Sequence, residues 1–163
     1  MNRQIGWVDK LTVFFASAGY VGYIPFASGT VTTLIVGVPL YYFVFSKLSS
    51  ILYLLALYIF FWFSCYVSHK AEIALQEKDS SKIVIDELIG YLVSLALLPN
   101  SWKIMAAGFV LFRIIDICKV YPADLVESKV PGGLGVVLDD VVAGIYANII
   151  LQAIIRLSPG LLC

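Results

Sequence analysis

Five acidic residues stand inside or at the edge of apolar segments, and they are the side chains of this chain best placed to do chemistry. Among eleven Asp and Glu residues in all, these five are Asp86, Glu87, Asp116, Asp139 and Asp140. A charge at the edge of hydrocarbon is costly, so it persists mainly where it forms an ion pair, binds an ion or takes part in a reaction. Because few basic residues lie near these acids, the pattern predicts a bound divalent cation.

The ligand types indicate which cation and which reaction to expect. Ligands that are all oxygens favour a hard cation, Mg²⁺ before Zn²⁺. Arg113 lies three residues before Asp116, and Lys119 lies three residues after it. Basic side chains beside a cation indicate an anionic ligand, most simply a phosphate, and the planar guanidinium of Arg113 suits phosphate oxygens well. A cation that polarises a phosphoryl oxygen and lowers the pKa of bound water would favour hydrolysis.

Each acidic motif also has a purely structural interpretation. The acid pair at 86–87 would be favourable in the first turn of a helix, where the helix dipole stabilises negative charge. Arg113 and Asp116 are neighbours on one helix face and could form a simple ion pair. The pair at 139–140 follows three apolar residues, so it lies inside a helix and a capping role explains it poorly. The structural alternative is therefore weakest for 139–140.

Small residues next to these motifs indicate a helix start and close packing of helices. Ser28, Gly29 and Thr30 precede an apolar run, which is typical of a helix N-cap. The exposed backbone N–H groups of such a helix start could equally receive a phosphate oxygen. Gly90 and Gly144 each lie four residues after an acid, and both would let a neighbouring helix come close.

The composition decides the class of protein. Hydrophobic residues make up 61% of the 163 residues and charged residues only 13%, whereas a soluble domain is about half apolar and about a quarter charged. We therefore expect an integral membrane protein with a single domain over residues 1–163. Lys and Arg are scattered, which argues against nucleic-acid binding. Three Cys without a CxxC spacing and a lone His69 give no Cys/His metal site.

Apolar stretches and their lengths predict the fold. A membrane-spanning helix needs about 20 residues, and several of the five stretches are shorter: 30–45, 51–67, 86–98, 104–118 and 134–157. The expected fold is an all-α integral membrane protein, with an N-terminal interfacial amphipathic helix over 3–18 and about four to five transmembrane helices, some of them short. Five crossings are the preferred arrangement. In the alternative, 86–118 forms a hairpin that does not cross the bilayer completely.

An alternating path through the membrane would bring the polar clusters to one face. The segment 29–30 precedes the first stretch, 79–87 separates the second from the third, 113–119 ends the fourth and 132–140 opens the fifth. Lys and Arg are more numerous on this side than on the other, and the positive-inside rule makes the richer side cytoplasmic. We therefore expect these four groups to meet at one cytoplasmic site.

In three of these motifs the chain resembles the phosphatidylglycerophosphatase A family. The motifs are IVIDELIG at 83–90, FRIIDICK at 112–119 and GGLGVVLDDVVAG at 132–144, in the family's order and at similar spacing. The resemblance covers nearly the whole chain, from 29–34 onward. Where the family usually has Pro-Gly-Thr and Lys-Pro-Trp-Pro, this chain has Ser-Gly-Thr at 28–30 and Lys-Val-Tyr-Pro at 119–122. Neither departure removes a charged residue.

The resemblance implies a Mg²⁺-dependent hydrolase of phospholipid synthesis, a lipid phosphatase that converts phosphatidylglycerophosphate to phosphatidylglycerol. It would be a multi-pass protein of the bacterial inner (cytoplasmic) membrane with its active site facing the cytoplasm. The metal ligands and the general base would come from Asp86, Glu87, Asp116, Asp139 and Asp140. The substrate phosphate would be bound by Thr30, Arg113, Lys119 and Lys129. Direct attack by water and attack by an Asp through a phosphoryl-enzyme are both open routes.

Three other functions are compatible with parts of the pattern. The substrate could be another lipid phosphate, such as phosphatidic acid or a prenyl diphosphate, because selectivity depends on the shape of the binding groove. A non-enzymatic cation transporter should spread its acids through the membrane depth and often has paired broken helices, and neither pattern is visible here. In a structural membrane protein the charges would only pair, but the acids outnumber the basic residues near them.

Overall fold

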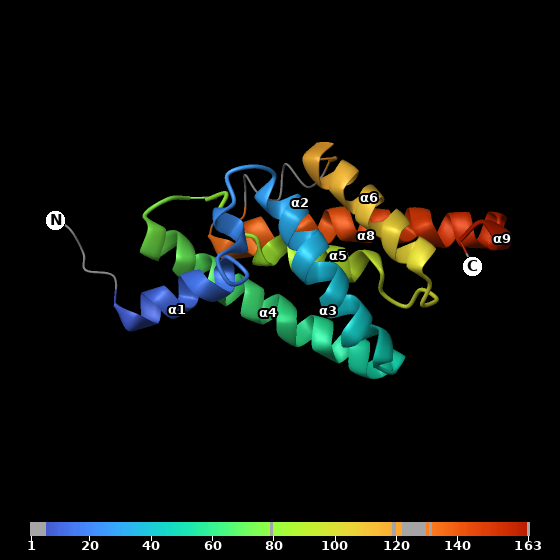
Figure 1. Ribbon diagram of the computed structural model, residues 1–163, viewed down its shortest axis with the longest axis horizontal. Helices are drawn as coiled ribbons and strands as arrows, with labels where there is room; N and C mark the ends of the chain where they lie inside the picture. Colours follow the sequence, from blue (N-terminus) through green and yellow to red (C-terminus); the bar gives the residue numbers. More distant parts are fainter. Residues whose placement is uncertain (1–5, 79, 119, 122–129, 131, 163) are drawn as a thin grey trace.

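Helices form the described part of the chain, and no strand occurs in it. The computed structural model describes residues 6–78, 80–118, 120–121, 130 and 132–162. In chain order (Figure 1) the elements are α1 (Trp7–Ala16), η1 (Val21–Tyr23), α2 (Ser28–Thr32), η2 (Thr33–Gly37), α3 (Val38–Phe43), η3 (Phe45–Lys47), α4 (Ser50–Leu75), α5 (Ile85–Ser94), α6 (Trp102–Cys118), α8 (Gly133–Leu157) and α9 (Pro159–Leu162). The predicted all-helical class is confirmed.

Three helical segments in the described residues are long and apolar enough to cross a membrane. They are Ser28–Lys47 with 20 residues, which runs from α2 through η3, α4 with 26 residues, and α8 with 25 residues. The π-helical stretch η2 lies within the first of these. Two further helices, α5 with 10 residues and α6 with 17, match the short ones expected from the sequence. The membrane class is confirmed, and the number of complete crossings stays a prediction.

The short helix α5 ends inside the protein, where a side chain of α8 caps its C-terminal end. Its first turn carries the acid pair at 86–87. At its other end, Asn148 of α8 donates to the carbonyl oxygens of Ser94 and Ala96, at 3.0 Å each. A helix that ends at membrane depth needs such partners, because lipid offers no hydrogen bonds to its free carbonyl groups. Tyr91 and Leu92 are fully buried, so α5 is an internal helix surrounded by other parts of the protein.

Glycines set the close packing of α5 against α8. A Cβ added to Gly90 would lie 2.7 Å from the carbonyl oxygen of Asp140 and 2.6 Å from the ring of Phe112, and one added to Gly144 would overlap the carbonyl oxygen of Gly90. Small residues allow helix backbones to approach in this way in membranes. The close packing predicted for Gly90 and Gly144 is confirmed, and it fixes the start of α5 beside the start of α8.

α1 lies against α4 and presents apolar side chains outward. Trp7 is 83% exposed, and Val8, Leu11 and Phe15 are also exposed, while Val13 and Ala16 are buried. An exposed apolar face on a short helix with Asp9 and Lys10 on its polar positions suits the membrane interface. The structure thus has the short N-terminal helix that the sequence predicts, starting at Trp7 within the described residues.

The connection between α1 and α2 is attached to the segment that precedes α5. The backbone N–H of Val84 donates to the carbonyl oxygen of Ala16 at 2.9 Å, and the Ser28 hydroxyl donates to the carbonyl oxygen of Ser81 at 2.9 Å. Ala27 has a left-handed backbone with a φ of 46°, which turns the chain sharply into α2. These contacts place the start of α2 beside the first turn of α5.

Candidate active site

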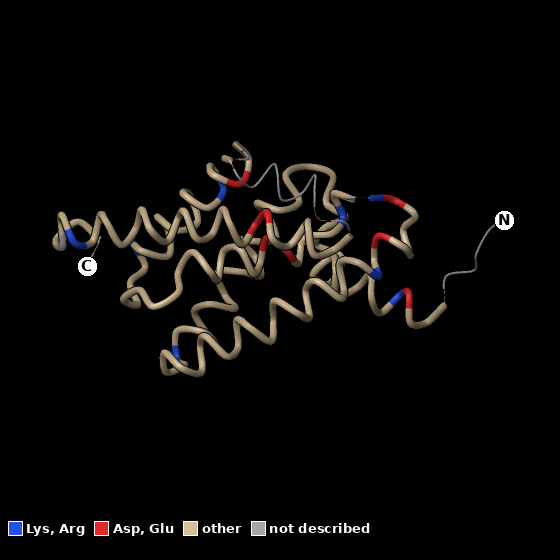
Figure 2. Tube along the Cα trace, turned by 180° about the vertical axis from the view of Figure 1, so that it is seen from behind, with Lys and Arg blue, Asp and Glu red and all other residues tan. Residues whose placement is uncertain are grey.

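The five acids predicted from the sequence line one cavity of about 240 Å³, here called the acidic cavity. Its described wall consists of Ser28, Ser80, Ser81, Ile83, Asp86, Glu87, Asp116, Val136, Asp139 and Asp140. Figure 2 shows acidic positions of α5 and α8 near the middle of the molecule, while most other charges lie toward its ends. Segments far apart in the sequence therefore converge here, as the alternating path predicts.

Three helices position the acids. The first turn of α5 supplies Asp86 and Glu87, the last turn of α6 supplies Asp116, and α8 supplies Asp139 and Asp140. Asp86, Asp139 and Asp140 are only 5–7% exposed. The Asp86 carboxylate accepts a hydrogen bond from the backbone N–H of Glu87 at 3.0 Å. The carboxylates are thus held on rigid elements rather than on loops.

Arg113 connects the acids of α5 and α6. Its Nη1 donates to Glu87 Oε2 and also pairs with Asp116 Oδ2 at 2.9 Å. The three side chains are only 13–17% exposed, so this is a largely buried ion-pair network. Arg113 Nε is buried without a hydrogen-bond partner in the described structure. The ion pair expected between Arg113 and Asp116 is present, and Glu87 extends it to a second helix.

Negative charge exceeds positive charge in the acidic cavity. Among the described residues, no Lys or Arg forms an ion pair with Asp86 or Asp140. Like charges this close repel each other, and burial strengthens the repulsion because water screens it less. A bound cation would offset this repulsion between the buried carboxylates. In charge and in the chemistry of the donor atoms, the cavity therefore suits a hard divalent cation.

The described carboxylates do not form a ready-made ligand shell. No group of three or more His, Cys, Asp or Glu residues in the described part of the chain stands close enough to hold a metal ion as placed. Side chains of the acidic cavity would have to turn inward to share one ion. Asp and Glu side chains have the rotatable bonds for this, and the cavity provides space of about 240 Å³.

A second, larger cavity adjoins the acidic cavity. This loop cavity has a volume of about 400 Å³ and a described wall of Gly22, Tyr23, Ile24, Pro25, Ala27, Ser28, Gly29, Ser81, Lys82, Glu87 and Arg113. The two cavities share Ser28, Ser81 and Glu87. A Cβ on Gly29 would overlap the Glu87 carboxylate, so only glycine lets Glu87 occupy this position between the cavities.

Lys82 is the basic residue that the segment before α5 contributes to the loop cavity. Its Nζ pairs with Glu77 at 3.3 Å and lies 5.9 Å from the ring centroid of Tyr23. The Ser80 hydroxyl also donates to Glu77, at 2.7 Å. Together the Ser80 hydrogen bond and the Lys82 charge lower the pKa of the Glu77 carboxyl below its ordinary value, so Glu77 is ionised at neutral pH.

The remaining substrate-binding predictions have mixed outcomes. Arg113 lines the loop cavity, and Thr30 is partly buried in α2 but is not among the described residues that line either cavity. Lys119 and Lys129 lie outside the described residues. Sequence reasoning expected the segment 79–87 at the site but gave no individual role to Ser80, Ser81 or Lys82. Their only signal was the polar stretch directly before the IVIDELIG motif, which hydropathy alone treats as a connection.

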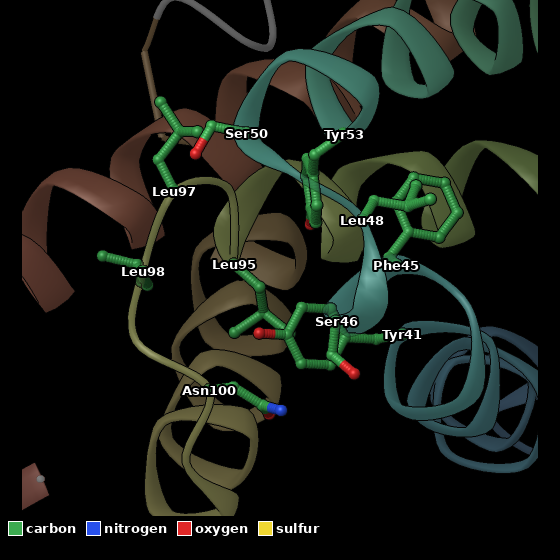
Figure 3. A pocket seen from close by; sticks show the side chains of 10 residues that line it. All are labelled: Tyr41, Phe45, Ser46, Leu48, Ser50, Tyr53, Leu95, Leu97, Leu98 and Asn100. Carbon is green, nitrogen blue, oxygen red and sulfur yellow. The ribbon is translucent and has the colours of Figure 1, made fainter.

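A third cavity lies at the opposite end of α5 and carries no comparable chemistry. It has a volume of about 140 Å³, and Figure 3 shows its ten lining residues, among them Tyr41, Tyr53 and Asn100. None of the ten is charged. The Tyr53 hydroxyl donates to the carbonyl oxygen of Leu92 at 2.7 Å, so it serves packing. The charged chemistry is thus concentrated at the other end of α5.

Comparison with known proteins gives the family. The family model for phosphatidylglycerophosphatase A matches residues 14–155, which is most of the chain and includes every acid of the acidic cavity. This chain belongs to the phosphatidylglycerophosphatase A family. Members of that family are phosphoric monoester hydrolases, so the chain is an enzyme of this class.

Individual relatives agree with this membership. Phosphatidylglycerophosphatase A of Haemophilus influenzae is 35% identical over 148 residues, covering 90% of this chain and 88% of the relative. Phosphatidylglycerophosphatase A of Escherichia coli is 36% identical over 134 residues, covering 82% and 77%. A Bacteroides thetaiotaomicron protein provisionally named phosphatidylinositol-3-phosphatase is 35% identical over 139 residues, covering 80% and 84%. No solved structure matches the chain.

The helices of this family member are therefore those of a membrane-bound lipid phosphatase. The matched region begins within α1 and ends within α8, so it contains both cavities and the helices that build them. The three relatives act on lipids according to their names, and their names differ in the lipid. The part of the site that contacts the lipid headgroup is therefore where differences in substrate specificity are expected.

Proposed function

We propose that this protein hydrolyses the terminal phosphomonoester of phosphatidylglycerophosphate, giving phosphatidylglycerol and inorganic phosphate, with Mg²⁺ as cofactor. The observation that carries this proposal is the acidic cavity, whose five carboxylates adjoin a roomier cavity that contains Arg113 and Lys82. Two relatives named for this reaction support the choice of substrate.

The proposed roles follow from the positions of the side chains. Arg113 lines the loop cavity and pairs with Asp116 of the acidic cavity, where its guanidinium can neutralise charge that develops on the phosphoryl oxygens. A carboxylate of the acidic cavity, with Asp140 the deepest candidate, takes the proton from the attacking water. As the water oxygen bonds to phosphorus, the bond from phosphorus to the glycerol oxygen breaks, and that oxygen receives a proton.

An Asp could also attack phosphorus first and be released by water afterwards. Isotope labelling gives a one-way test. With water containing ¹⁸O, label in an Asp carboxylate of the protein during turnover would require a phosphoryl-enzyme opened at the carboxyl carbon and would exclude direct attack as the only path.

Mg²⁺ would be held by Asp86, Glu87, Asp116, Asp139 and Asp140. When bound, it would polarise a phosphoryl oxygen and acidify a water molecule. The chain's own contribution is to hold these acids on three helices around one cavity, with Arg113 compensating the charge of Glu87 and Asp116. Thr30, Lys119 and Lys129 remain proposed phosphate ligands beside Arg113.

The proposed location is the inner (cytoplasmic) membrane of a bacterium, with the site facing the cytoplasm. The long apolar helices α4 and α8 support a multi-pass membrane protein. The excess of Lys and Arg on the side of the acidic cavity supports the orientation. A lipid substrate would approach laterally and would place its headgroup in the loop cavity.

A second candidate substrate is another lipid phosphate. The Bacteroides thetaiotaomicron relative, whose provisional name specifies a phosphatidylinositol phosphate, is as similar to this chain as the other two. Phosphatidic acid and prenyl diphosphates also present a phosphate at a membrane surface. These lipids share the reacting group and differ only in what lies beyond it.

A substrate panel tests the proposal. The purified protein in detergent is given phosphatidylglycerophosphate, phosphatidic acid, phosphatidylinositol 3-phosphate or a prenyl diphosphate, and released phosphate is measured with Mg²⁺ and with a chelator. We expect the highest kcat/KM for phosphatidylglycerophosphate and loss of release with the chelator. A higher kcat/KM for another lipid would make that lipid the substrate in place of phosphatidylglycerophosphate. Undiminished phosphate release with the chelator would exclude the Mg²⁺ requirement.

A further inference from the structure

The loop cavity offers a second basic residue at a distance from the reacting carboxylates. Lys82 and Arg113 both line this cavity, while Lys82 is not among the described residues of the acidic cavity. Because the two cavities share Ser28, Ser81 and Glu87, one ligand can extend from the acids into the loop cavity. Arg113 pairs with Glu87 and Asp116 of the acidic cavity, whereas Lys82 pairs with Glu77, which does not line it. Such a ligand would therefore meet Arg113 beside the acids and Lys82 elsewhere in the loop cavity.

The two basic residues differ in how firmly they are already engaged. Arg113 is held by Glu87 and Asp116 in a largely buried network. The ion pair of Lys82 with Glu77 is much more open, with side chains 40% and 52% exposed. Exposed pairs of this kind are weak, because water screens them. Lys82 can therefore exchange Glu77 for an incoming anion without the cost of opening a buried pair.

The backbone around Lys82 is fixed although its side chain is partly exposed. A Cβ on Gly22 would overlap the carbonyl oxygen of Lys82, so the connection from α1 packs tightly against this residue. On either side of it, Ser81 accepts from the Ser28 hydroxyl and Val84 donates to Ala16. Lys82 is thus attached to the cavity wall and is not part of a free loop.

We infer that Lys82 binds the second phosphate of a lipid that carries two, while the terminal monoester lies in the acidic cavity. This rests on the proposed function and narrows its substrate class. Phosphatidylglycerophosphate has a diester phosphate and a monoester phosphate joined by glycerol, whereas phosphatidic acid has a single phosphate. A basic residue in the adjoining cavity adds binding energy only for the lipid with the second phosphate, so Lys82 is a specificity-determining residue.

The test compares two lipids in the full-length protein. Phosphate release from phosphatidylglycerophosphate and from phosphatidic acid is measured in the same mixed micelles with Lys82→Gln, Lys82→Arg and Lys70→Gln. Lys70 is the matched control, because its Nζ also lies 5.9 Å from a tyrosine ring, that of Tyr66, and it is exposed but does not line the loop cavity. If phosphatidic acid is not hydrolysed, its inhibition constant as a competing lipid replaces its KM.

Loss of one charge-assisted contact at a partly exposed site predicts a roughly five- to tenfold rise in KM. We expect this rise for phosphatidylglycerophosphate with Lys82→Gln, a change below about twofold for phosphatidic acid, and kcat nearly unchanged. Lys82→Arg should have a KM close to that of the unaltered protein, and Lys70→Gln should leave the values for both lipids unchanged.

Two results would overturn the inference in different ways. If the unaltered protein releases phosphate from phosphatidylglycerophosphate and Lys82→Gln leaves its KM unchanged, or raises the values for both lipids equally, Lys82 does not recognise the second phosphate and the proposed function stands. If the unaltered protein releases no phosphate from phosphatidylglycerophosphate, the proposed function fails and this assignment fails with it.

Discussion

The carboxylates of the acidic cavity are the residues that a purely structural role explains least well. Asp139 and Asp140 are buried inside a long apolar helix, where stability alone would select apolar side chains. Arg113 neutralises part of the cluster through Glu87 and Asp116. Single residues thus fall into a paired network around Arg113, and Asp86 and Asp140, with which no described Lys or Arg forms an ion pair.

Removal of Arg113 should destabilise the protein strongly. Arg113→Ala leaves Glu87 and Asp116 buried without their partner, and breaking a buried pair from one side costs about 3–5 kcal/mol. We expect a lowered thermal unfolding temperature in detergent. The triple variant Arg113→Met, Glu87→Gln and Asp116→Asn removes the charges together and should recover most of the stability but not the activity. Equal stability of Arg113→Ala and the unaltered protein would show that the network is not structural.

At the scale of elements, the short helix α5 determines the site. Its first turn supplies two of the acids, and its close contact with α8 brings Asp139 and Asp140 beside them. The contact depends on Gly90 and Gly144, which have no room for a side chain. The packing of α5 against α8 thus determines the geometry of the acidic cavity.

A methyl group at Gly90 should separate the two helices. Gly90→Ala places a Cβ 2.7 Å from the carbonyl oxygen of Asp140 and 2.6 Å from the Phe112 ring, and such overpacking costs about 1–3 kcal/mol. We expect lower thermal stability together with lower kcat. Gly160→Ala is the control, because nothing lies within 4 Å of its added Cβ. A Gly90→Ala protein as stable and active as the control would contradict the packing described for α5 and α8.

At the scale of the whole molecule, the acidic cavity and the uncharged cavity of Figure 3 lie at opposite ends of α5. Lys78 is exposed and lies two residues before Ser80 of the acidic cavity, and Asn100 is exposed and lines the uncharged cavity. If the acidic end faces the cytoplasm, positions near the two cavities should be accessible from opposite sides of the membrane. The orientation of the protein in the membrane can therefore be tested with single cysteines at these two positions.

Cysteine labelling tests the orientation. In a chain whose own three Cys are replaced by Ser, expressed in bacterial cells, a membrane-impermeant maleimide should label Asn100→Cys from outside. It should label Lys78→Cys only after the membrane is opened. Both variants should react in opened membranes, which controls for accessibility. Labelling of Lys78→Cys in intact cells would reverse the proposed orientation.

Sequence reasoning predicted that the five acids lie together, because a charge beside hydrocarbon is visible in a single sequence, while their catalytic and metal-binding roles stay predictions. It also predicted the contact made by Gly90 and Gly144, since small residues at helix spacing indicate close packing. It could not show where α5 ends, because that depends on Asn148 reaching the carbonyl oxygens of Ser94 and Ala96 from another helix. Lys82 lies in the segment 79–87 that was expected at the site, but it received no role of its own, since only the folded α1–α2 connection makes it part of a cavity.

The measurement that tests the central claim most directly is phosphate release from phosphatidylglycerophosphate by Asp140→Asn in the presence of Mg²⁺. Asn keeps the size of the buried side chain and removes its charge and its basicity. We predict a fall in kcat of at least about 100-fold, the usual contribution of a general base, with the protein still folded by thermal unfolding in detergent. Unchanged kcat in a folded Asp140→Asn protein would contradict the claim that the acidic cavity carries out the hydrolysis.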